Sequence, residues 1–265
     1  MLLALLHRSF RRARALLMAL AAVLAAFQVL VVLAAGYLHQ QGGFSQVVAL
    51  LPPMAQQLMG GVFSSFGSMV AFGYFHPVVI IVMVGLAIVV ASEPAADVES
   101  GVVDLVLARP IRRGHLVTRS LLMLLLTTSI IASLMVAASW SSLQMLAPPG
   151  ASLRAAVVAK LATNLVAVAW AAGALALAVA SLAKRRGAAA GGVAIVVLAL
   201  YLLNVLAEIN PRIRPYAPLS PFHYYQPIGI VSGMGTRWAG DVSLLVGVAA
   251  VFAAVAFVAY SKRDL

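Results

Sequence analysis

Six long apolar runs dominate the sequence, and each is long enough to cross a bilayer as an α-helix. The hydrocarbon core of a membrane is about 30 Å thick, which requires about 20 helical residues. Only 9% of the 265 residues are charged, whereas soluble domains carry about 25%. The sequence therefore predicts an all-α integral membrane protein with a single transmembrane domain over 1–265. Its spans are expected at about 15–38, 67–92, 116–140, 161–182, 187–206 and 242–260.

The first fourteen residues have a different pattern from the spans. Leu6 and Phe10 share one helical side, whereas Arg8 and Arg12 share the other. This pattern is typical of a helix that lies in the headgroup plane on an anionic membrane face. We expect an interfacial helix over 2–14, followed by a first span too long for the apolar core of a signal peptide.

Proline interrupts the pattern in two other places. The second span contains Gly73 and His76-Pro77, so a kinked helix that begins near Gly67 is expected. Residues 208–241 contain five prolines and a cluster of aromatic residues, with no run long enough to span. We expect short re-entrant or interfacial elements there, on the outer side and packed against protein.

The distribution of basic residues predicts the topology. If both termini are cytoplasmic, thirteen of the eighteen Lys and Arg residues lie on the inner side and five on the outer side, as the positive-inside rule requires. Because these residues flank the apolar runs, the net charge of +11 does not indicate a nucleic-acid partner. Arginine outnumbers lysine fifteen to three, which is typical of GC-rich bacterial genomes. The expected location is the bacterial inner (cytoplasmic) membrane.

A charged segment at 93–114 separates the second and third spans. Pro94 suits a first helical turn and Pro110 suits a helix end, so the pattern predicts a helix over 94–109. Its apolar face would contact the transmembrane bundle and its acidic face would be available to a partner. An amphipathic connector on the bilayer surface is the alternative. The apolar face holds Val98, Val102, Leu105 and Val106, and the polar face holds Asp97, Ser100 and Asp104.

The residues of this segment resemble the first cytoplasmic loop of ABC-2 type (type 2 exporter) ABC transporter permeases. That loop typically reads E-x-x-x-G-x-L-x-x-L-L-x-x-P-x-x-R before the third span. Asp104 stands where the family often has glutamate or another residue, and Arg119 lies near a common lysine. The matching pieces are Glu99-x-Gly101, Asp104-Leu105, Leu107-Ala108-Arg109-Pro110 and Arg112-Arg113.

The resemblance covers nearly the whole chain, including the Pro218–Phe222 segment and the terminal pattern Tyr260-x-x-Arg263-Asp264-Leu265. In that family the loop is a coupling helix that seats in a cleft of a separate ATPase subunit. The resemblance implies a permease subunit of an ATP-driven exporter, working with a second permease copy or homologue. The implied ATPase-coupling residues are Asp97, Glu99, Gly101, Asp104, Arg109, Pro110, Arg112 and Arg113.

The chain carries no motif for chemistry of its own. It lacks the phosphate loop G-x-x-x-x-G-K-S/T as well as H-E-x-x-H and G-x-S-x-G. We therefore expect no enzyme activity and no cofactor in this chain, with ATP and Mg²⁺ bound by the partner ATPase. By analogy with the family, Tyr74, Tyr201 and Asn204 would line the substrate path, and the scarcity of charge there suggests an amphipathic or apolar cargo.

Two other function classes remain open from the sequence. A secondary transporter half that dimerises would lose transport when the proton gradient is collapsed, but not when ATP is removed. A membrane assembly subunit would move nothing. Carboxylates are lacking within the predicted spans, and Glu208, at a helix end, is the nearest candidate. This disfavours the first alternative, since ion-coupled transporters usually carry ionisable groups within their spans.

Overall fold

The computed structural model describes residues 2–50, 52–53, 56, 60–101, 114–233 and 237–262. In these residues all regular secondary structure is helical, and six helical segments are long and apolar enough to cross a membrane. The predicted all-α, six-span fold class is confirmed at this level. The spanning segments are α1 (Leu2–Gln40), α4 with α5 (Phe66–Phe75 and Pro77–Ala91), α8 (Gly114–Leu146), α9 (Ala155–Leu182), α10 (Arg186–Ile209) and α12 (Trp238–Ser261).

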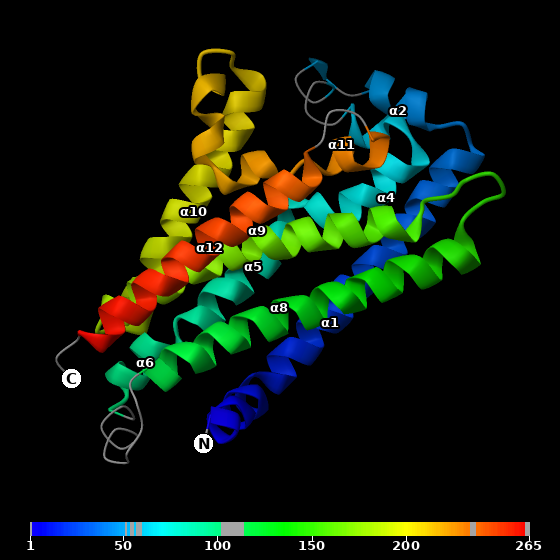
Figure 1. The fold of residues 1–265 in the computed structure, drawn as a ribbon. Coiled ribbons are helices and arrows are strands. Elements are labelled where there is room, and N and C mark those ends of the chain that lie inside the picture. Colours follow the sequence, from blue (N-terminus) through cyan, green and yellow to red (C-terminus); the bar gives the residue numbers. More distant parts are fainter. Residues whose placement is uncertain are drawn as a thin grey trace.

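Helix α9 forms the centre of the bundle, and α5, α8, α10 and α12 pack around it (Figure 1). Small residues make this close packing possible, because backbones approach one another where side chains are short. Gly173 of α9 faces Leu124 of α8 and Ala87 of α5, and all three lie in the buried core. Helix α1 lies along α8 at the edge of the bundle.

The second span is broken where the sequence predicted a kink. Pro77 has no N–H group, and His76 adopts an extended conformation with φ −54° and ψ 131°. The His76 Nδ1 atom accepts a hydrogen bond from the backbone N–H of Val78 at 3.2 Å and so caps α5. The span begins at Phe66, one residue before the predicted start, and ends at Ala91.

The N-terminal region differs from the prediction in its continuity. A single helix runs from Leu2 to Gln40, with no break between the predicted interfacial helix over 2–14 and the first span. No residue in this stretch is proline or glycine before Gly36, so the sequence contains no strong helix breaker there. The other helices extend beyond the predicted spans by up to six residues at an end.

Short elements occupy one end of the molecule (Figure 1). Between α10 and α12 the described residues form η2 (Arg214–Leu219), η3 (Pro221–Tyr224) and α11 (Pro227–Ser232). Helix α2 (Phe44–Leu50) and η1 (Val62–Ser64) lie at the same end. The chain ends labelled N and C lie at the opposite end, near α6 (Glu93–Glu99).

Candidate functional site

Helix α6 begins where the charged segment of the sequence begins. Pro94 occupies its first turn as predicted, and Ser92 precedes it. The helix ends at Glu99, ten residues before the predicted end, because Gly101 adopts a left-handed conformation with φ +68°. The prediction of a continuous helix over 94–109 is therefore wrong. Residues 102–113, with Asp104, Arg109, Pro110, Arg112 and Arg113, lie outside the described residues.

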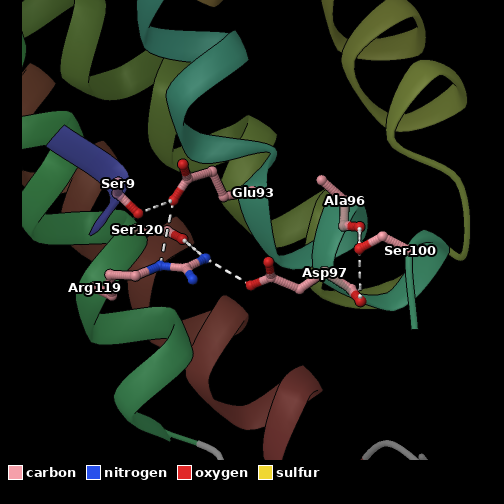
Figure 2. Close-up of polar contacts among 7 residues, drawn as sticks. All are labelled: Ser9, Glu93, Ala96, Asp97, Ser100, Arg119 and Ser120. Carbon is pink, nitrogen blue, oxygen red and sulfur yellow. Dashed lines mark hydrogen bonds and ion pairs between the residues drawn. The ribbon is translucent and has the colours of Figure 1, made fainter. Parts of the chain in front are cut away.

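The acidic face of α6 points toward the bundle and meets one buried arginine (Figure 2). Glu93 and Asp97 are four residues apart and therefore share a helix face. Arg119 of α8 donates a hydrogen bond from Nη2 to Asp97 Oδ2 at 2.8 Å. Its Nε lies 3.2 Å from Glu93 Oε2, a contact that is electrostatic because Nε makes no hydrogen bond in the described part of the chain.

A serine from α1 completes this arrangement, which we call the α6 cluster: Ser9, Glu93, Asp97 and Arg119. The Ser9 hydroxyl donates to Glu93 Oε2 at 3.0 Å. Arg119 is only 6% exposed, so its charge needs the two carboxylates to offset the desolvation cost. The cluster fixes α6 to both α1 and α8.

A second polar contact fixes the other end of α6. The Glu99 carboxylate accepts a hydrogen bond from the backbone N–H of Arg186, the first residue of α10, at 2.8 Å. A negative charge at this position also stabilises the positive end of the α10 dipole. The Arg186 side chain reaches back to α5 and donates from Nη2 to the carbonyl of Val89 at 3.0 Å.

Apolar packing fixes the middle of α6. Ala95 is fully buried and packs against Ala180 of α9 and Ala189 of α10. Together with the polar contacts, this packing connects a seven-residue helix to α1, α8, α9 and α10. A displacement of α6 would therefore be transmitted to four of the six spans.

One of the acidic residues, Asp97, has contacts that differ from those expected of it. Asp97 was expected to be available to a partner protein, but its side chain is only 16% exposed and is paired with Arg119. Asp97 pairs with Arg119 rather than facing solvent because a buried guanidinium without a carboxylate is costly in free energy. Glu99 and Gly101 are exposed, so they remain accessible at the surface.

The three predicted substrate-path residues are not brought together. Tyr74 is fully buried, and its hydroxyl donates to Ser139 Oγ at 2.9 Å. Ser139 in turn donates to Gln28 Oε1 at 3.1 Å, and Gln28 Nε2 donates to the Gly73 carbonyl at 2.6 Å. Tyr74 thus belongs to a polar network that joins α1, α4 and α8, which is the interhelical role expected of polar residues in spans.

Tyr201 and Asn204 line a cleft of about 740 Å³ at the end of the molecule opposite α6. We call it the outer cleft, because the predicted topology would place it on the outer side. One face of α10 forms one wall, and residues of α4, α5, η1, η2, η3 and α11 form the rest. Tyr201 packs edge-on against Phe222 with ring centroids 5.2 Å apart. The Asn204 side chain donates to Glu208 Oε1 at 3.3 Å.

Several residues around α6 and in the outer cleft were not predicted from the sequence. The four-residue spacing of Glu93 and Asp97 was a readable signal for a shared basic partner. No local signal identified Ser9 or Arg186, since their contacts join segments more than 80 residues apart. In the outer cleft Arg214, His223 and Tyr225 were not predicted, whereas Glu208 was named only as the ionisable residue nearest to a span.

Comparison of the chain with models of known protein families and with curated proteins found no match.

Proposed function

We propose that this chain is the membrane-spanning permease subunit of an ATP-driven ABC exporter. In this proposal it forms the substrate path and works as a pair with a second permease copy or homologue. A separate ATPase subunit binds ATP and Mg²⁺, docks on the cytoplasmic side and supplies the energy. Both termini are cytoplasmic, and the membrane is the bacterial inner membrane.

The attachment of α6 to the bundle is the observation that carries the proposal. A coupling element must receive a force at the surface and pass it to the spans. Helix α6 has an exposed end at Glu99, Ser100 and Gly101, and its buried side is tied to α1, α8, α9 and α10 by the α6 cluster, the Glu99–Arg186 contact and the Ala95 packing. A simple surface connector does not need buried ionic contacts, because each of them costs desolvation energy.

The resemblance of the sequence to ABC-2 type permeases supports the same assignment. Its coupling residues Glu99 and Gly101 lie at the exposed end of α6, where a partner can reach them. The revised role of Asp97 is to position α6 rather than to contact the ATPase. The role of Asp104, Arg109, Pro110, Arg112 and Arg113 remains the contact with the ATPase.

A reconstitution experiment tests the proposal. The purified chain should hydrolyse no ATP by itself, and it should bind an ATPase subunit encoded beside it and change the hydrolysis rate of that subunit. Proteoliposomes that contain both proteins should lose transport when ATP is removed, and not when the proton gradient is collapsed. Transport that follows the proton gradient would instead identify a secondary transporter. ATP hydrolysis by the purified chain alone would also overturn the proposal.

A further inference from the structure

The outer cleft carries charges of both signs next to an apolar wall. Tyr201, Asn204 and Glu208 lie on one face of α10, at the three- and four-residue spacing of a helix. Arg214 of η2 and His223 of η3 line the same cleft. Among the described residues that line it, Glu208 is the only acidic one.

Glu208 and Arg214 form no ion pair with another described residue. The ion pairs of the described residues all involve Arg119. Glu208 receives a single hydrogen bond, from Asn204, and His223 is close enough to act on its charge. A carboxylate near the end of a spanning helix, with bonding capacity left over, marks a functional site by default.

The rest of the lining suits a hydrocarbon chain. Phe75, Ile80 and Ile228 line the cleft from α4, α5 and α11. On the other faces of α10, Leu202 and Leu206 are about half exposed, at 49% and 48%, as expected of residues that face lipid. The cleft therefore offers polar groups at the membrane surface and apolar groups along the span.

We infer that the outer cleft binds an amphiphile with a zwitterionic headgroup, such as a phospholipid whose ammonium contacts Glu208 and whose phosphate contacts Arg214. This assignment rests on the proposed function, for which it names the class of cargo. A volume of about 740 Å³ falls in the range of small-molecule sites, about 300–1,000 Å³. It accommodates a headgroup and the first part of the chains.

Lipid binding to the purified chain in nonionic detergent, measured by native mass spectrometry, tests the site without any ATPase. The probes are phosphatidylethanolamine, phosphatidylglycerol and diacylglycerol with identical acyl chains, and soluble glycerophosphoethanolamine. We expect phosphatidylethanolamine to bind about tenfold more tightly than phosphatidylglycerol, because a hydrogen bond to a charged group is worth about that factor. Diacylglycerol lacks both charged groups and the soluble headgroup lacks the acyl chains, so both should also bind more weakly than phosphatidylethanolamine.

Two variants separate the two charges. Glu208→Gln should weaken phosphatidylethanolamine binding about tenfold and leave phosphatidylglycerol binding equal or stronger, since the carboxylate repels an anionic lipid. Arg214→Gln should weaken binding of both lipids. Asp241→Asn and Arg212→Gln are matched controls, because these residues do not line the cleft, and they should change neither affinity.

Three results would overturn the inference. They are wild-type binding of phosphatidylethanolamine by Glu208→Gln, an equal loss of affinity in the control variants and the cleft variants, and binding of the soluble headgroup as tight as that of the lipid. Retained phosphatidylglycerol binding shows that the Glu208→Gln protein is folded. Failure of the ATPase experiment with intact lipid selectivity would overturn the proposed function and leave the binding site standing.

Discussion

Arg119 Nη2 donates a hydrogen bond to Asp97 Oδ2 at 2.8 Å, across 22 positions of sequence. This bond ties α6 to α8. With Glu93 and Ser9 it forms the α6 cluster. A helix held in this way moves with the bundle, which is the mechanical property that a coupling element requires.

Removing the arginine should destabilise the protein strongly. Arg119→Gln leaves the carboxylates of Glu93 and Asp97 without a cation in a mostly buried site, and breaking such a pair costs about 3–5 kcal/mol. SDS-induced unfolding of the purified chain measures this loss. Arg154→Gln is the control: Arg154 is exposed, so its loss should cost less than about 0.5 kcal/mol. Equal effects of the two changes would contradict the role of the α6 cluster.

The Gln28 network predicts a contrast between two glycines of the second span. A Cβ atom at Gly73 would overlap Gln28 Oε1, whose amide is held by Ser139 and by the Gly73 carbonyl. Gly73→Ala should therefore destabilise the chain by about 1–3 kcal/mol.

Gly85→Ala is the matched control, because no atom lies within 4 Å of the added Cβ. It should be neutral or stabilising by up to about 1 kcal/mol, as alanine favours the helix. Thermal unfolding in detergent compares the two variants. If the Gly73→Ala protein were as stable as the Gly85→Ala protein, Gln28 could move away from the added Cβ without loss of stability.

Much of the fold could be predicted from the sequence because apolar length is a strong local signal. The break at His76-Pro77 follows from the missing N–H of proline, and the short elements of 208–241 follow from the prolines and the lack of a long apolar run. The end of α6 was missed because Gly101 was read as part of a family motif rather than as a helix terminator.

The sites were less predictable because they depend on long-range contacts. Whether Asp97 faces water or the bundle depends on Arg119, and no local rule specifies that contact. Tyr201 and Asn204 were chosen by analogy and do line a cleft. Tyr74 was chosen by the same analogy, but Ser139 and Gln28 hold it inside the bundle.

The proposed topology can be checked with single cysteines, because the wild-type chain has none. Ser152 and Ser100 are both exposed. Ser152 lies in the connection between α8 and α9, whereas Ser100 directly follows α6. In sealed cells an impermeant maleimide should label Ser152→Cys and not Ser100→Cys. After permeabilisation both should react. Labelling of Ser100→Cys in intact cells would contradict cytoplasmic termini.

The exposed end of α6 and the residues that follow it in the sequence should control coupling. Glu99→Lys combined with Asp104→Lys should weaken ATPase binding by about 2–5 kcal/mol, the cost of reversing a desolvated interfacial charge. Because Glu99 also caps α10, Glu99→Gln serves as a control that keeps a hydrogen-bond acceptor. Asp241→Lys adds positive charge at the first turn of α12, outside the coupling region, and should leave binding unchanged.

The most direct test of the permease assignment is the ATP hydrolysis rate of the partner ATPase, measured with the wild-type chain and with the Glu99→Lys, Asp104→Lys double variant in proteoliposomes. We expect the wild-type chain to change this rate. The double variant should not change it, although it is present in the membrane in the same amount. An equal change in rate with both proteins would contradict this expectation, and the charged segment would then be a surface connector.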